Sequence, residues 1–354
     1  SVLSLFQNDL WNDAQPLTDT ENCSGIPGLK FIDAIKLSTA IGFPLTGIKR
    51  KYVFVATTLE ELYEYYSEVN GEPTADEIAR LDSEDGGSHQ VVKFIDDISE
   101  EICRIEDCYR RGERGYTIAK ACKKDEILSK EKCRIFYGNS IALTYLIRKY
   151  FLPLLRVLQM NPLVSECAVG INSHGPEWSE FHDHIFQFGD DRLIGGDYGK
   201  YDQKLPSQLI IASLRILIDC AKCCKYTRQD LDIMEAMVGD IVYATIAYNG
   251  DLIGLTEGTH ISGNSLTVII NGLCGSLNLR AYFFSHFENF GLKFQDHIAL
   301  MTYGDDNIGS VHKDIHNFTI KGASEFLARY GQVTPCPIRK VSCWNSCPKN
   351  NSSF

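Results

Sequence analysis

The sequence lacks the features that mark membrane-spanning and secreted proteins. Hydrophobic residues make up 44% of its 354 residues, but no uninterrupted apolar run approaches the roughly 20 residues that a transmembrane helix needs. The first residues do not combine a basic segment with a following apolar run, as a signal peptide does. Internal repeats and low-complexity tracts are also lacking. We therefore expect a soluble, cytosolic chain that is long enough for two interleaved subdomains around a shared core.

The thirteen cysteines do not form the pattern of a disulfide framework. They are scattered through a long chain without a secretory signal, which favours reduced thiols. Two groups have spacings similar to those of metal sites, and these are Cys220, Cys223 and Cys224, and Cys336, Cys343 and Cys347. The first group lies in an apolar stretch with helical periodicity, where buried thiols behave as small hydrophobic groups. We therefore favour structural thiols over a zinc site.

Negative charge is concentrated in one segment of the chain. Of the net charge of −11, residues 60–101 contribute −12, which leaves the remainder at +1. Turn-rich sequences at 71–74 and 85–88 interrupt this segment, which favours a solvated insertion over core. Residues 110–134 have the opposite balance, with nine basic and four acidic residues. We interpret residues 110–134 as a basic patch, so the overall acidity does not exclude a nucleic-acid partner.

The apolar periodicity predicts a strand, two helices and a hairpin, in that order. A buried strand is expected at 192–198, and a helix follows Pro206 and continues to residue 224, because proline suits a first helical turn. A turn and a second helix are expected over 262–284. Strands at 298–303 and 307–311 flank a tight turn at 304–306.

Two aspartates lie at the ends of predicted strands. Asp197 ends the first strand, and Asp305 lies in the hairpin turn. Carboxylates in such places can converge to bind two divalent cations, which stabilise the attacking and leaving oxygens of phosphoryl transfer. Mg²⁺ prefers oxygen ligands of this kind. An isolated Asp-Asp pair is usually turn chemistry, but the flanking apolar strands and the nearby Asp202 favour a catalytic site, with Asp306 as an accessory ligand.

Four ordered motifs resemble those of RNA-dependent RNA polymerases from picornavirus-like positive-strand RNA viruses. Asp197-Tyr-Gly-Lys-Tyr-Asp202 resembles motif A, Ser262-Gly-Asn-Ser-Leu-Thr267 with Asn271 resembles motif B, and Tyr303-Gly-Asp-Asp306 resembles motif C. Upstream, Lys124-Asp-Glu126 followed by Lys132-Cys-Arg134-Ile135 resembles the basic fingers motif F. The order and spacing of the motifs also match the family.

The resemblance implies an α+β right-hand polymerase fold, in which a palm with an antiparallel sheet and flanking helices is joined to fingers. We expect residues 1–190 to be mostly fingers, 191–225 palm with motif A, 226–260 a return to the fingers, and 261–354 palm with motifs B, C and D. Only 48 residues follow Asp306, so we expect the thumb to be largely missing and the chain to be a fragment.

The resemblance also implies a reaction, namely RNA synthesis from ribonucleoside triphosphates with two Mg²⁺ ions, or with Mn²⁺ in their place. Asp197, Asp305 and Asp306 would hold the metals. Positive charge is needed near the triphosphate, and the implied contacts come from the basic side chains of Lys124, Lys132 and Arg134. Lys340, after a predicted motif D helix at 321–330, would protonate the departing pyrophosphate.

Recognition of the ribose 2′-hydroxyl requires polar partners, because a site that hydrogen-bonds this group rejects the analogue without it. The resemblance assigns this role to Asp202 and Asn271, supported by Ser262 and Thr267. Gly263 would make the motif B loop flexible near template and nucleotide, since glycine tolerates unusual backbone angles.

Two other functions stay open. A reverse transcriptase shares the palm and the paired aspartates, but usually carries a bulky steric gate where this chain has polar ribose partners. A non-catalytic RNA-binding fragment is the second alternative. For a polymerase we expect RNA template and product, nucleotides, a protein primer and other viral replication proteins as partners. We also expect no direct membrane anchor and a location in the host cytoplasm, at viral replication complexes.

Overall fold

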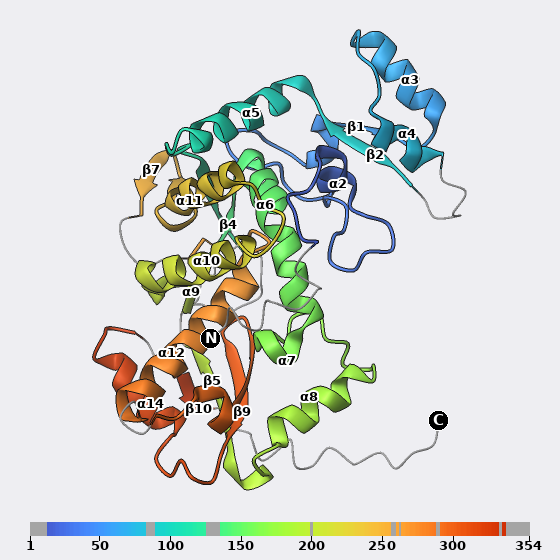
Figure 1. The fold of residues 1–354 in the computed structure, drawn as a ribbon. Helices are drawn as coiled ribbons and strands as arrows, with labels where there is room; N and C mark the ends of the chain where they lie inside the picture. The colour runs from blue at the N-terminus through green and yellow to red at the C-terminus, as the bar shows by residue number, and fades with distance from the viewer. Residues whose placement is uncertain are drawn as a thin grey trace. The chain divides into compact units, whose positions relative to one another are not determined.

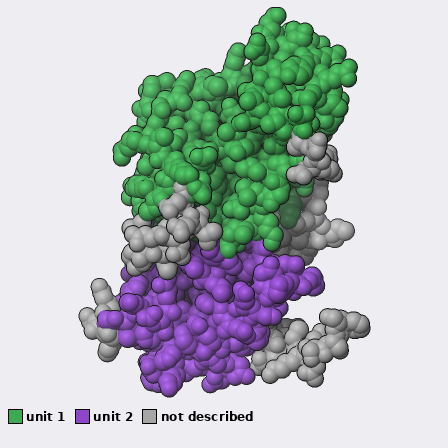
Figure 2. All heavy atoms as spheres, turned by 45° about the vertical axis from the view of Figure 1, so that its right-hand side comes forward, with its two compact units in different colours: residues 1–160, 214–267 green, residues 161–213, 268–354 purple. Residues whose placement is uncertain are grey.

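The computed structural model describes residues 13–82, 89–124, 135–198, 201–255, 260–261, 263–287, 291–332 and 335–337. The chain divides into two compact units (Figure 2), and its course alternates between them. Unit 1 comprises residues 1–160 and 214–267, and unit 2 comprises 161–213 and 268–354. These boundaries differ from the subdomain limits expected after residues 190, 225 and 260, which stay a prediction.

Unit 1 contains most of the helices in the first half of the chain (Figure 1). Threonine side chains cap the first turns of several of them, as in the capping box of Thr58 and Glu61. The long helix α5 packs against α6 and α11. The bounds are α2 (Asp19–Ser24), η1 (Lys49–Tyr52), α3 (Leu59–Glu68), α4 (Ala75–Leu81), α5 (Asp96–Arg110), α6 (Ile141–Met160) and α11 (Arg228–Val242), while α10 (Ser207–Ala221) crosses the unit boundary.

Two small sheets complete the described part of unit 1. Strands β1 (Val53–Ala56) and β2 (Val91–Phe94) form an antiparallel pair. The second sheet has the order β4-β3-β6-β7 and is antiparallel except between β3 and β6. Its strands are β3 (Ile118–Lys123), β4 (Ile135–Gly138), β6 (Thr245–Tyr248) and β7 (Asp251–Gly254).

The described part of the acidic segment, residues 60–82 and 89–101, packs more closely than the solvated insertion that we expected, and the turn-rich sequence at 85–88 lies outside the described residues. Most of its described carboxylates are exposed, as expected. However, a small core joins Leu62 and Tyr66 of α3 to Ala56 of β1 and Val91 of β2, and Leu81 of α4 packs against it. Glu77 is only 2% exposed and forms an ion pair with Lys93 at 3.0 Å. The segment therefore contributes a core of its own, which its charge did not indicate.

Unit 2 is built on an antiparallel sheet with the order β10-β5-β9-β8. Its strands are β5 (Leu193–Tyr198), β8 (Ile298–Tyr303), β9 (Asp306–Val311) and β10 (Pro335–Pro337). Its helices are α7 (Pro162–Ser165), α8 (Glu177–Phe186), η2 (Asp190–Arg192), α9 (Tyr201–Lys204), α13 (Phe294–His297) and α14 (Ile320–Ala328), and α12 (Thr267–Phe287) starts at the unit boundary.

Helices cover both faces of the unit 2 sheet. Successive residues of a strand point to opposite faces, so neighbouring residues of β8 contact different helices. On one face, Leu300 of β8 belongs to a cluster with Leu279 and Phe283 of α12. On the other face, Met301 packs with Phe181 of α8. The strand is therefore buried on both sides, which explains its continuous apolar sequence.

The predicted strands, helices and hairpin are confirmed by β5, α10, α12, β8 and β9, and α14 confirms the helix expected at 321–330. Within the described ranges, no helix combines the length and the apolar character needed to cross a membrane.

Candidate functional site

Two neighbouring strands of unit 2 bring the predicted metal ligands to one end of the sheet. Gly196 of β5 lies opposite Asn307 of β9. The strands are antiparallel, so Asp197, which follows Gly196, lies beside Asp306, which precedes Asn307. The backbones of the two aspartates are therefore cross-strand neighbours. Asp305 lies in the turn that joins β8 to β9. Three residues with carboxyl groups thus lie at the same end of the sheet, although the Asp197 side chain lies outside the described atoms.

The turn presents its two aspartates to solvent. Gly304 has φ 62°, in the left-handed region that favours glycine, and both Asp305 and Asp306 are exposed. Their hard carboxylate oxygens are the donors that Mg²⁺ prefers. Among the described side chains, which exclude that of Asp197, no group of three or more His, Cys, Asp or Glu is arranged to hold a metal. Asp305 and Asp306 are therefore candidate metal ligands, and the part of Asp197 in the site stays a prediction.

A tyrosine links the helix of Asp202 to the helix of Asn271. The hydroxyl of Tyr201, in α9, donates to the backbone oxygen of Asn271 at 3.1 Å. Asn271 is 9% exposed, and its Oδ1 is buried without a hydrogen-bond partner. An unpartnered buried acceptor is costly unless a ligand or water satisfies it. The residue before Asp202 is therefore bonded to Asn271, while the Asp202 side chain lies outside the described atoms.

Burial keeps Tyr201 in its neutral, donating form. Its ring packs against Tyr198 with centroids 4.3 Å apart. Its pKa is raised well above the usual value, first by burial and then by Cys274, Tyr198 and Asp305.

The motif B loop of unit 1 begins with a close backbone approach. Gly263 has φ 113°, and a Cβ there would lie 2.0 Å from the backbone oxygen of Tyr137, so only glycine fits. The Oδ1 of Asn264 accepts from Leu266 N at 2.9 Å and from Thr267 Oγ1 at 3.3 Å. These bonds order the start of α12. Ser262 lies outside the described residues.

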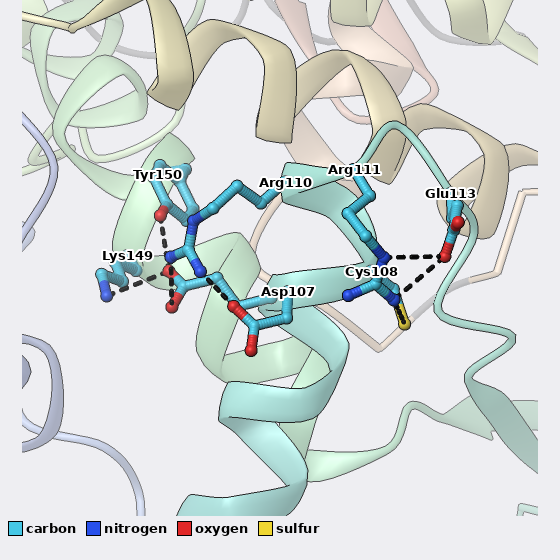
Figure 3. A network of polar contacts seen from close by, with 8 residues as sticks. Asp107, Cys108, Arg110, Arg111, Glu113, Lys149 and Tyr150 are labelled. Atoms are coloured by element: carbon cyan, nitrogen blue, oxygen red, sulfur yellow. Dashed lines mark hydrogen bonds and ion pairs between the residues drawn. The ribbon is translucent and has the colours of Figure 1, made fainter.

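The three described arginines of the predicted basic patch are each paired with a carboxylate. Arg110 pairs with Asp107, Arg111 donates to Glu113 at 3.0 Å, and both networks lie at the end of α5 (Figure 3). Arg114 donates to the buried Asp240 at 2.8 Å. The partners of Arg110 and Arg114 lie outside residues 110–134, so the charge count over this segment overstates the positive charge at these two side chains.

Of the remaining predicted contact residues, only Lys124 lies within the described residues. Lys124 follows β3 and is exposed, as a phosphate contact would require. Lys132, Arg134 and Lys340 lie outside the described residues.

The cysteine group of Cys220, Cys223 and Cys224 lies at the end of α10. Cys224 Sγ donates to the backbone oxygen of Cys220 at 3.2 Å, and burial raises the pKa of Cys224 to about 11.

Comparison with known proteins agrees with the four motifs. The sequence matches the family model described as viral RNA-dependent RNA polymerase over residues 5–354. The chain belongs to this family. The resemblance inferred from the motifs is therefore confirmed.

The chain is also similar to small parts of viral polyproteins. The chain is 24% identical to the genome polyprotein of Deformed wing virus over 318 residues, which is 86% of the chain and 10% of the polyprotein. It is 28% identical to the replicase polyprotein of Drosophila C virus over 223 residues, 58% of the chain and 12% of the polyprotein.

A solved polymerase shares the fold. The Sicinivirus 3Dpol RNA dependent RNA polymerase matches with a TM-score of 0.67 and 17% identity, over 96% of this chain and 62% of that one. The predicted α+β right-hand polymerase fold is therefore confirmed. The chain spans less than two thirds of that polymerase.

Two features of the candidate site were not predicted from the sequence. One is Tyr201, whose contact with Asn271 joins residues 70 positions apart. The other is Gly272, where a Cβ would lie 2.6 Å from Thr302 Oγ1. A glycine inside a helical pattern was a signal for such a close approach, whereas Tyr201 gave none.

Proposed function

We propose that this chain forms the metal-binding and nucleotide-selecting part of an enzyme that copies RNA templates into RNA during the replication of a positive-strand RNA virus. Its main support is the adjacency of β5 and β9, which carry Asp197 and Asp306, with Asp305 in the neighbouring turn. Carboxylates at one end of neighbouring strands suit two-metal phosphoryl transfer. In this proposal residues 191–225 and 261–354 belong to the palm, and the rest of the chain belongs mostly to the fingers.

The metals would be held by Asp197, Asp305 and Asp306. Two Mg²⁺ ions, or Mn²⁺ in their place, would stabilise the attacking and leaving oxygens. The exposure of Asp305 and Asp306 leaves room for substrate phosphates beside them.

Basic residues of motif F would neutralise the triphosphate, with Arg134 as the principal contact and Lys124 and Lys132 beside the nucleotide channel. Lys340 would donate the proton that the pyrophosphate needs as it leaves. The exposure of Lys124 is the structural support for this group.

Sugar selection would depend on Asn271 and Asp202, with Ser262, Thr267 and Gly263 shaping the adjacent loop. The buried, unpartnered Oδ1 of Asn271 suits a hydrogen bond within the ribose-recognising network. A polar site of this kind penalises a deoxyribose, because its buried groups would lose their partners.

The proposed partners are RNA template and product, ribonucleoside triphosphates, a protein primer and other viral replication proteins. The chain matches small parts of viral polyproteins, which supports a role beside other replication proteins. We place this activity in the host cytoplasm, at viral replication complexes.

The test is nucleotide incorporation by the complete polymerase that contains this chain, on a primed RNA template with Mg²⁺. We expect extension with ribonucleotides and strong discrimination against deoxynucleotides. Preferred incorporation of deoxynucleotides would instead support a reverse transcriptase. Binding of RNA without any incorporation would support the non-catalytic alternative.

A further inference from the structure

A buried ion pair in unit 2 lies beside the strand that leads to the Asp305 turn. Glu166 directly follows α7, and its side chain is 8% exposed. Arg280 of α12 donates to both of its carboxylate oxygens, from Nη1 at 2.7 Å and from Nη2 at 2.6 Å. Ser276 Oγ adds a third bond at 2.6 Å. This bidentate geometry fixes the orientation of the carboxylate as well as its position.

The backbone of Glu166 holds β8 at the same time. Its carbonyl oxygen accepts from Thr302 N at 2.8 Å and from Thr302 Oγ1 at 2.9 Å. Ala168 N returns a bond to Thr302 O at 2.8 Å. Within the described sheet β8 is an edge strand, and this short segment occupies its outer edge. Thr302 is separated from Asp305 only by Tyr303 and Gly304.

Arg280 also contacts the short helix α13, which precedes β8. Its guanidinium lies over the ring of Phe294, 4.2 Å from the centroid, and the α13 helix of Phe294 directly precedes β8. Helix α12 thus holds β8 near its start through Phe294 and at its end through Glu166. The same helix carries Asn271, the predicted ribose reader.

The backbone of Glu166 has an uncommon conformation, with φ 57° and ψ 22° in the left-handed region. Such conformations persist for side chains other than glycine when the surroundings determine them. Buried ion pairs are weak sources of stability, and their best-attested role is to specify one arrangement. A role in geometry therefore explains this pair better than a role in stability alone.

We propose that Glu166 is a positioning residue, which couples the Asp305 hairpin to α12 and so fixes the metal ligands relative to Asn271. The proposal rests on the proposed function for its catalytic consequence, but the coupling itself is a property of the folded chain. Loss of the coupling should displace the hairpin and loosen both catalysis and sugar choice.

The test compares Glu166→Gln with Glu77→Gln. Both glutamates are buried acceptors of several hydrogen bonds, since Glu77 accepts from Thr74 N at 2.7 Å, from Tyr66 OH at 2.9 Å and from Lys93 Nζ at 3.0 Å. Glu77 lies in unit 1 and in none of the predicted sites. Arg280→Lys is the second variant, because lysine keeps the charge but loses the bidentate fork.

The first measurement is amide hydrogen exchange of the chain without metal or nucleotide. Glu166→Gln and Arg280→Lys should each accelerate exchange at Thr302 and Ala168 by about tenfold, since local opening governs exchange. Glu77→Gln should leave these two amides unchanged. Unchanged exchange at Thr302 in both unit 2 variants would overturn the proposal.

The second measurement is steady-state incorporation by the complete polymerase. Glu166→Gln should lower kcat by about tenfold to a hundredfold, because a small misplacement of a catalytic group has effects of this size. The nucleotide KM should stay within about twofold, as expected for an interaction that acts on the transition state. The preference for ribonucleotides over deoxynucleotides should fall, whereas Glu77→Gln should retain the kcat and the preference of the wild type.

Equal losses of kcat and of sugar preference in Glu166→Gln and Glu77→Gln would overturn the positioning role, because general destabilisation would then explain both. If the wild-type polymerase makes no RNA, the proposed function is wrong. The exchange at Thr302 would still decide whether Glu166 couples the hairpin to α12.

Discussion

Replacing Gly272 with alanine tests the close packing of α12 against β8. A Cβ at this position would lie 2.6 Å from Oγ1 and 3.3 Å from Cβ of Thr302. Overpacking of this kind costs about 1–3 kcal/mol, whereas alanine gains about 1 kcal/mol over glycine within a helix. We therefore expect Gly272→Ala to lower the free energy of unfolding by roughly 0–2 kcal/mol.

Gly275→Ala, one turn later on α12, is the matched control. Its Cβ would lie 3.8 Å from Tyr201 Oη and 3.9 Å from Tyr198 Cε2, which is ordinary contact. This variant should gain about 1 kcal/mol from helix propensity alone. Urea unfolding should then separate the two variants by roughly 1–3 kcal/mol. Equal stabilities, or a less stable Gly275→Ala variant, would refute the packing argument.

Two further predictions concern acid stability and sugar choice. Burial lowers the pKa of His260 from 6.5 to about 4, so between these pH values the unfolded chain binds a proton that the folded chain does not. The free energy of unfolding should therefore fall by about 3 kcal/mol as the pH drops through this window. Urea unfolding at several pH values checks this, and an equal acid loss in His260→Leu would contradict it. Asn271→Ala should reduce the ratio of kcat/KM for ribonucleotides over deoxynucleotides by about tenfold or more, and an unchanged ratio would exclude the ribose role.

The local patterns in the sequence predicted the centre of unit 2 well. The apolar run before Tyr303, the turn at Gly304 and the return strand gave the β8–β9 hairpin, because strand and turn preferences agreed there. The run ending at Tyr198 gave β5 for the same reason. The motif resemblance then gave the antiparallel partnership of these strands within a known fold.

Contacts between distant residues had no local signal. Glu166 and Arg280 are 114 positions apart, and nothing in either neighbourhood indicates the other. The charge count over residues 110–134 failed for a related reason, since Asp107 and Asp240 lie outside that window but neutralise Arg110 and Arg114. Charge summed along a sequence ignores partners that folding brings from elsewhere.

The most direct test of the metal-dependent polymerase function compares Asp305→Asn with Asp251→Asn in the complete polymerase. Both aspartates are exposed and lie at hairpins, but Asp251 begins β7 in unit 1. The first ribonucleotide addition with Mg²⁺ should slow by at least about a hundredfold in Asp305→Asn, because a preorganised electrostatic group is lost. Asp251→Asn should keep the wild-type rate. Equal rates for wild type and Asp305→Asn would contradict the proposed metal site.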